Sequence, residues 1–227
     1  NDIWPDPDPK PRDTTVTPLA DLPAFVQTPA AAPMKGSPYL SPSDLPGAKA
    51  LPGEGLEEAQ AKAYGTFVHA LMEHATPGHP LPQLAAPTEL DHALAERAVE
   101  EATRVINTAG FADIFASGAL REVDIVAQVA GKTMRGTIDC LIVNDSSVRI
   151  IDFKSNRAVP QRSDAVPEGI VNQMAAYATA ISQIYPDHAI TCEILWTATP
   201  HLMSLSHDIV RQAQQKLAYL DDLPNAP

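Results

Sequence analysis

The sequence predicts a mixed α/β (α+β) domain, in which an antiparallel three-stranded meander forms part of a central sheet flanked by helices. Three observations lead to this prediction. Apolar residues recur every three or four positions in four segments, which is the periodicity of amphipathic helices. Between residues 122 and 154 they alternate with polar residues, as they do in strands. Two turn sequences divide this stretch into three, and strands with helices on both sides are typical of layered α/β and α+β domains.

The helical segments are expected at residues 56–74, 89–108, 168–185 and 207–220. Each carries one apolar stripe, which indicates that it packs on a core with a single face. A further strand is expected at residues 190–197, between the last two helices. The expected order is therefore helix, helix, three strands, helix, strand, helix.

The meander is expected to contain strands at residues 122–129, 133–143 and 148–154. A Gly-Lys turn at 131–132 and an Asn-Asp turn at 144–145 separate them, and such short polar turns favour hairpins. Successive strands joined by hairpins are antiparallel neighbours, so the middle strand should pair with both others.

Prolines set the first part of the chain apart. Residues 1–55 hold 12 of the 22 prolines, and each proline favours an extended conformation in the residue before it. We therefore expect a proline-rich linker or arm over residues 1–55, with one short helical turn at 41–45, and a folded domain over residues 56–227.

Composition limits the function. A net charge of −12 argues against a protein that grips nucleic acid by bulk electrostatics, although carboxylates that hold a divalent cation invert the sign locally. No run of about 18 apolar residues is present, so no membrane span is expected. The two cysteines, Cys140 and Cys192, form no metal-binding spacing, and we expect free buried thiols in a cytoplasmic protein.

A carboxylate and an ammonium stand together at the end of the third strand, in Asp152-Phe153-Lys154. Side chains two apart on a strand share a face and lie about 6.5 Å apart, so Asp152 and Lys154 point together while Phe153 points into the core. Asp152 could hold a cation, and Lys154 could orient a water or stabilise charge on a phosphate oxygen. Taken alone, the pair is better explained as a surface ion pair.

Asp139 makes a bound cation the better interpretation. It lies in the second strand, where strict alternation places Ile138 and Cys140 together on the opposite face. A carboxylate among apolar residues is costly unless it is paired or bound to a metal. The turn at 144–145 brings Asp139 roughly opposite Asp152, and facing carboxylates need a cation or a shared proton. Oxygen ligands of this kind favour Mg²⁺ or Mn²⁺.

Other polar residues are weaker candidates for the same site. Glu122, in the first strand, could line it, but a solvated charge on an edge strand is an equal alternative. His69 follows Gly65 by one helical turn, and Tyr177 follows Gln173 likewise. For these the alternatives are a satisfied polar side chain and an ordinary helix surface.

These residues, in this order, resemble the RecB-like branch of the PD-(D/E)xK nucleases. The resemblance covers about residues 56–205. Its motifs are Gly65-x-x-x-His69, Gly136-x-x-Asp139, Asp152-Phe153-Lys154 and Gln173-x-x-x-Tyr177. More narrowly, the sequence is similar to the C-terminal nuclease domains of the AddA family of helicase-nuclease subunits. That similarity rests on residues 39–45, 65–73 and 193–197.

The resemblance implies a restriction-endonuclease-like fold and a Mg²⁺-dependent (or Mn²⁺-dependent) deoxyribonuclease. It implies an exonuclease in bacterial double-strand break repair and homologous recombination, cutting a single-stranded DNA end. The implied partners are a helicase portion of the same polypeptide and an AddB-like second subunit. Two alternatives stay open: a catalytically silent nuclease-fold module that docks a helicase or nuclease, and a hydrolase of small phosphate esters.

The resemblance also implies residue roles. The metal ligands would be the side chains of His69, Asp139 and Asp152 and the backbone carbonyl of Phe153. Lys154 would position the attacking water or stabilise the phosphate. Gln173 and Tyr177 would orient Lys154 or the DNA strand, and Glu122 joins the catalytic candidates. Ile138 stands where the family name has its proline, a departure that many members of this branch share.

Overall fold

A five-stranded mixed sheet lies at the centre of the structure, a computed structural model that describes residues 39–49, 56–76, 78–129 and 131–218. Most of the predicted arm lies outside these residues. The described residues all belong to one compact unit, 37–227. The strands are β1 (Leu120–Val129), β2 (Lys132–Val143), β3 (Ser147–Lys154), β4 (Ala189–Trp196) and β5 (His201–Ser204).

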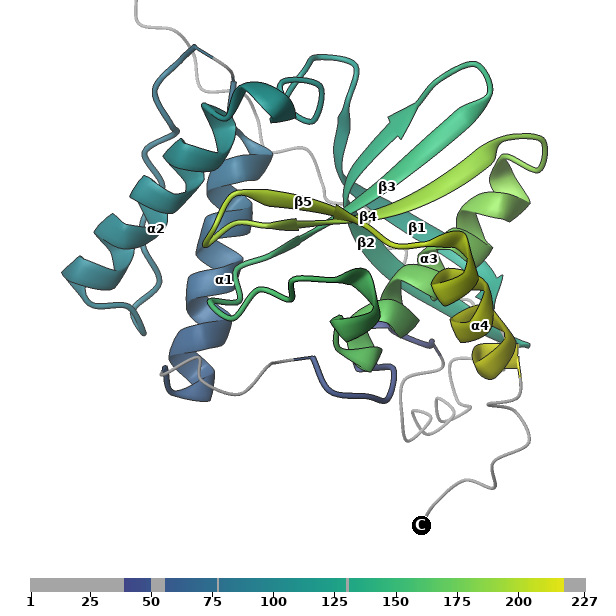
Figure 1. Ribbon diagram of the computed structural model, residues 1–227. Coiled ribbons are helices and arrows are strands. Elements are labelled where there is room, and N and C mark those ends of the chain that lie inside the picture. Colours follow the sequence, from purple (N-terminus) through teal and green to yellow (C-terminus); the bar gives the residue numbers. More distant parts are fainter. Residues whose placement is uncertain (1–38, 50–55, 77, 130, 219–227) are drawn as a thin grey trace, which may run out of the picture. The chain divides into compact units, whose positions relative to one another are not determined.

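Within the described residues, four α-helices and three short 3-10 turns accompany the sheet (Figure 1). The α-helices are α1 (Glu58–Glu73), α2 (His92–Ile106), α3 (Glu168–Ile184) and α4 (His207–Ala218). The turns are η2 (Pro42–Asp44), η3 (Ala109–Phe111) and η4 (Ser163–Ala165). The four predicted helices and the helical turn in the arm are therefore confirmed. No helix in the described part of the chain has the length and apolar character needed to cross a membrane.

The strands follow the order β1-β2-β3-β4-β5, and the predicted antiparallel meander is confirmed. β4 runs parallel to β3, because α3 returns the chain to the same end of the sheet. β5 pairs antiparallel with β4 and was not predicted. With four residues it is too short to show an alternating pattern.

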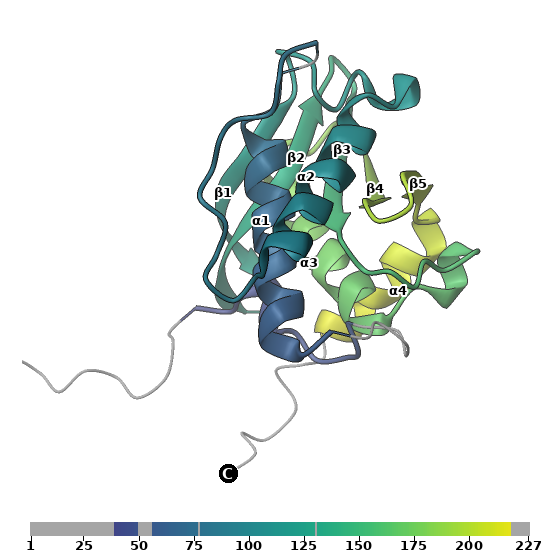
Figure 2. The same cartoon turned by 90° about the vertical axis from the view of Figure 1, so that its left-hand side faces the viewer.

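The sheet separates two hydrophobic cores. One contains residues of α3 and α4, the other residues of α1 and α2. Seen from the second side, α1 and α2 lie in front of the sheet (Figure 2). Both cysteines are buried and free, as predicted. This three-layer arrangement is the mixed, helix-flanked sheet that the sequence predicts.

The alternation of β2 breaks at one residue. Met134 and Ile138 belong to the core under α3, and strict alternation would place Cys140 with them. Cys140 instead belongs to the core under α1 and α2, and Leu141 to the core under α3. The prediction that Ile138 and Cys140 share a face is therefore wrong. The residue between them, Asp139, lies where the two faces of the strand exchange.

The described end of the arm packs on the domain. The backbone N–H of Leu40 donates to the carbonyl of Thr133 (2.8 Å), and the carbonyl of Leu40 accepts from the N–H of Arg135 (3.0 Å). β3 does not reach this half of β2, so Leu40 covers an edge that would otherwise be unpaired.

Gly136, on β2, lies directly beneath Pro42 of the arm. A Cβ atom there would lie 2.9 Å from Cδ of Pro42 and 3.2 Å from Cε1 of Tyr177. We expect Gly136→Ala to lower the free energy of unfolding by about 1–3 kcal/mol, because a rigid ring and a buried ring must both shift. Urea denaturation measures the change.

Gly118→Ala is the matched control, since nothing lies within 4 Å of a Cβ at Gly118. Adding Pro42→Ala to Gly136→Ala should recover part of the loss, which a double-mutant cycle detects. Equal stability of the Gly136→Ala and Gly118→Ala proteins would contradict the packing argument.

Candidate active site

The site lies where β2 and β3 part. Their ladder ends at the pair Cys140–Ile151, and in that register the next pair would be Asp139 and Asp152. The strands do not pair there. The N–H of Phe153 donates instead to Oδ2 of Asp139 at 2.5 Å. The two carboxylates thus lie at the fork of the sheet, roughly opposite each other, as the turn at residues 144–145 predicts.

The backbone of Phe153 has a further consequence. In an extended strand, the N–H and C=O of one residue point to the same edge. The N–H of Phe153 points toward β2, so its carbonyl lies on that edge too, beyond the end of the ladder. β4 continues alongside β3 as far as the pair Lys154–Trp196, on the opposite edge. This placement fits the carbonyl of Phe153 as a ligand group.

His69 reaches Asp139 from α1. Its Nδ1 lies 3.5 Å from Oδ1 of Asp139, and its ring meets the ring of Phe153 edge-on, with centroids 5.8 Å apart. Burial lowers the pKa of His69, but the charge of Asp139, its hydrogen bond and the charge of Asp152 together outweigh burial, and the pKa lies above its ordinary value. For Asp139 burial acts in the other direction and raises the pKa. His69, Lys154 and the N–H of Phe153 outweigh burial and bring the pKa below its ordinary value.

Asp152 is held by a lysine and an amide. Only 3% of the residue is exposed. Its Oδ2 lies 2.5 Å from Nζ of Lys154, an ionic contact without hydrogen-bond geometry. Its Oδ1 accepts a hydrogen bond from Nε2 of Gln173 (3.0 Å), and Oε1 of Gln173 accepts from Nζ of Lys154 (3.5 Å). Gln173, on α3, therefore fixes both members of the Asp152–Lys154 pair.

The two aspartates have opposite pKa shifts. Burial raises the pKa of Asp152 above its ordinary value, and the nearby charge of Asp139 adds to this effect, while Lys154 opposes it. Burial lowers the pKa of Lys154, but Asp152 and Asp139 outweigh burial and raise it. The pKa of Asp139 therefore lies below its ordinary value and that of Asp152 above it. Carboxylates whose pKa values are pushed apart are typical of catalytic sites.

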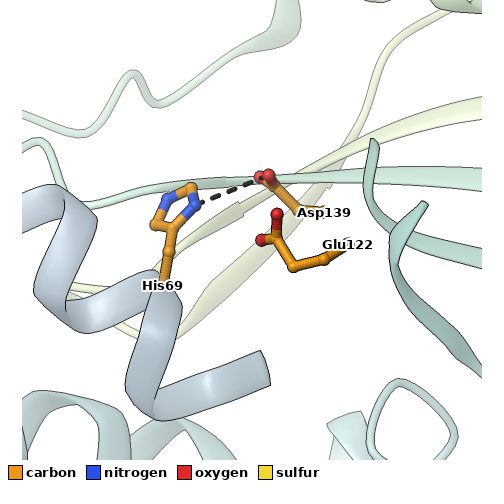
Figure 3. A group of neighbouring side chains, drawn as sticks. All are labelled: His69, Glu122 and Asp139. Carbon is orange, nitrogen blue, oxygen red and sulfur yellow. Dashed lines mark ion pairs between the residues drawn. The ribbon is translucent and has the colours of Figure 1, made fainter. Parts of the chain in front are cut away.

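Glu122 completes a second cluster with His69 and Asp139. One possible ligand atom from each residue lies within 4.8 Å of the others, and Figure 3 shows the three side chains together. Burial raises the pKa of Glu122, and Asp139 raises it further. An imidazole and two carboxylates suit a divalent cation. Asp152 is not part of this cluster, because Lys154 and Gln173 hold it on the α3 side.

The backbone of Glu122 is left-handed, with φ of 50°, and no other non-glycine in the described residues has a positive φ. The β1–β2 ladder omits Glu122 and Asp139 while its register stays the same on both sides. Each strand therefore has one unpaired residue at the same level. Strained residues in such positions cluster at functional sites.

Tyr177 lies one helical turn after Gln173. Its hydroxyl donates to the carbonyl of Thr137 at 2.6 Å, which ties α3 to β2 two residues before Asp139. Burial raises the pKa of Tyr177 well above its ordinary value, so the hydroxyl stays protonated. Gln173 contacts Lys154 directly, whereas the hydroxyl of Tyr177 bonds the strand that carries Asp139.

A buried carboxylate behind Lys154 was not predicted. Glu101, on α2, is 3% exposed and accepts hydrogen bonds from the hydroxyls of Tyr64 (2.8 Å) and Thr197 (2.6 Å). The N–H of Thr197 donates to the carbonyl of Lys154 (2.9 Å), so this network anchors the lysine backbone. The signal was present in the sequence, since Glu101 interrupts the apolar face formed by Ala98, Ala102 and Val105.

The fold and the site together define a class of protein. A helix-flanked mixed sheet that brings a histidine, two aspartates and a D-x-K lysine to a fork between two strands has the layout of a metal-dependent nuclease domain. Residues 47–225 match the PD-(D/E)XK nuclease superfamily, and the chain belongs to that superfamily.

One solved structure supports this fold. The chain is similar to the crystal structure of an inferred exonuclease from Eubacterium rectale, with a TM-score of 0.52 and 14% identity over 74% of this chain and 66% of that one. It thus spans just under two thirds of that protein. A weaker similarity is to the protein SSO0001, with a TM-score of 0.33 and 16% identity over 58% of this chain and 68% of the other. No protein with a curated description matches.

Proposed function

We propose that the chain is a Mg²⁺-dependent or Mn²⁺-dependent deoxyribonuclease, the exonuclease domain of a bacterial helicase-nuclease of the AddAB or RecBCD type. One observation carries the proposal. His69, Asp139, Asp152 and Lys154, from one helix and two strands, converge at the fork between β2 and β3. Their order and spacing resemble those of the RecB-like branch, and the superfamily match supports a nuclease.

The residues of the site fit a divalent cation. Asp139 has a lowered pKa, Glu122 and His69 lie beside it, and Asp152 has a buried oxygen that contacts only the ammonium of Lys154. We assign the metal to His69, Asp139, Asp152 and the carbonyl of Phe153. Glu122 is a further oxygen donor. A bound cation lowers the pKa of its water and screens the charge of a phosphate.

Lys154 supplies the remaining chemistry. Its pKa is raised, so it is a permanent cation at neutral pH, and Gln173 limits where its ammonium can lie. A positioned ammonium stabilises the charge that builds on a phosphate oxygen or orients the water that attacks it. Tyr177 holds β2, and with it Asp139, against α3.

The proposed partners follow from the same resemblance. We assign a helicase portion of the same polypeptide and an AddB-like second subunit, in double-strand break repair and homologous recombination in the cytoplasm. The net charge of −12 supports a division of labour, because an acidic domain holds long DNA weakly and a helicase can deliver the strand. The proline-rich arm over residues 1–55 is proposed as the connection, and residues 56–227 as the nuclease domain.

A cleavage assay with the 227-residue chain tests the activity. We expect end-labelled single-stranded DNA to be shortened in Mg²⁺ or Mn²⁺, and to stay intact in EDTA, because the acidic cluster needs a cation to accept a phosphate. Product lengths on a denaturing gel are the measurement. Cleavage of equal rate in EDTA would contradict the metal assignment. No cleavage in either metal would favour the silent docking module.

A further inference from the structure

A basic cavity of about 490 Å³ opens beside Lys154. Its walls come from the start of α1, from α2 and from the loop that leaves β3. That loop passes α1 closely, since a Cβ at Gly65 would lie 3.0 Å from Oγ of Ser155. The loop can lie this close to α1 because Gly65 has no side chain. Lys154 of the candidate active site also lines the cavity, so the two adjoin.

The lining of the basic cavity is positively charged in an acidic chain. Of the 16 lysines and arginines of the sequence, five line it, against one carboxylate, Glu58. The five are Lys49, Lys62, Arg97, Lys154 and Arg157. Apart from Lys154, none of them forms an ion pair with a carboxylate of the described residues. A concave surface lined by one sign of charge concentrates its field, so this cavity attracts anions despite the net charge of −12.

Arg97 is held in place within this lining. Its guanidinium carbon lies 4.6 Å from the centre of the Tyr64 ring, and its Nε donates to the Tyr64 hydroxyl at 3.3 Å. Tyr64 is fixed in turn by the buried Glu101. No hydrogen bond to a described residue engages the two terminal nitrogens of Arg97. A guanidinium fixed in this way is suited to a phosphate, because little freedom is lost when it binds.

We propose that the basic cavity binds the phosphodiester backbone of a single DNA strand beside the bond that is cut. The inference rests on the proposed function and adds where the strand lies. A cavity of this volume is of the size that holds a small molecule, which matches one or two nucleotides. A duplex, whose major groove alone is about 12 Å wide, is too large to enter. The strand lies in the cavity against the start of α1 and the loop after β3, with Lys154 at its inner end.

The test compares two double variants of equal charge. Lys62→Gln/Arg157→Gln removes two exposed cations of the basic cavity. Arg211→Gln/Lys216→Gln removes two exposed cations of α4, which do not line it. Binding of a fluorescent 20-nucleotide thymidine strand is measured by anisotropy in EDTA over a salt series. EDTA separates this binding from cleavage, so the result stands whether or not the proposed nuclease activity is found.

We expect the cavity variant to bind about tenfold more weakly at low salt, with a slope of log K against log salt smaller by about 1.4, since each lost single-strand phosphate contact removes about 0.7. The α4 variant should bind like the unchanged chain. In Mg²⁺ the cavity variant should show a raised KM and a nearly unchanged kcat. Equal slopes for the two variants would overturn the proposal. An equal loss of binding to a blunt duplex of the same length would overturn the single-strand assignment.

Discussion

Asp152→Asn is expected to lower the rate of DNA cleavage by at least about 10³-fold, equivalent to about 4 kcal/mol of transition-state stabilisation. The substitution keeps the shape of the side chain and the oxygen that accepts from Gln173. It removes the buried charge that pairs with Lys154 and that would hold a cation. The substitution removes a charged metal ligand and the ion-pair partner of Lys154 together. The loss of cleavage rate should therefore exceed the loss caused by removing any single hydrogen bond of the site.

Initial rates on end-labelled single-stranded DNA in saturating Mn²⁺ measure this effect. Asp145→Asn is the matched control, because Asp145 is an exposed aspartate in the turn between β2 and β3 and its replacement changes the net charge equally. The control should cleave at the unchanged rate. An Asp152→Asn protein within tenfold of the unchanged chain would remove Asp152 from the active site.

Lys154→Gln is expected to lower the rate of cleavage by about 10²- to 10³-fold, the usual cost of losing one charge-stabilising group. Its effect on the metal should differ from that of Asp152→Asn. Lys154 is a cation 2.5 Å from Asp152, so its loss removes a competitor for that carboxylate, and affinity for Mn²⁺ should hold or rise. Asp152→Asn should weaken Mn²⁺ by at least about tenfold.

Single-turnover cleavage and calorimetric titration with Mn²⁺ separate the two roles. Lys216→Gln is the control for the loss of one lysine, since Lys216 lies on α4 in an exposed pair with Glu168. A parallel loss of cleavage and of Mn²⁺ affinity in the Lys154→Gln protein would show that the lysine supports the metal site rather than the reaction.

The sequence was informative wherever a pattern repeats over many residues. The four helices and the meander have long apolar periods, and the turn at residues 144–145 was enough to place Asp139 near Asp152. His69 and Gln173 were placed at the site only by the resemblance to a family. Both lie far from the strands along the chain, so no local pattern predicts that they contact Asp139 and Lys154.

Other features left no local trace. The change of face at Asp139 was not predicted. Ile138 and Cys140 are both apolar, so the sequence alternates in the same way whether they pack in one core or in two. β5 is too short for a period. The basic cavity was missed because Lys62, Arg97 and Arg157 are far apart in sequence, and a net charge sums over the whole surface.

Glu122 and Asp139, the two residues that the β1–β2 ladder leaves unpaired, limit where this hairpin can change in length. The two residues lie on opposite arms of one hairpin, and the register is the same on both sides of them. A matched lengthening of both arms toward the hairpin tip leaves the two carboxylates face to face. One residue added to a single arm between the tip and the break shifts the pairing and sends every later side chain to the other face of the sheet. The arms of the β1–β2 hairpin can therefore change length only together, and the hairpin that joins Asp139 to Asp152 is bound by the same condition.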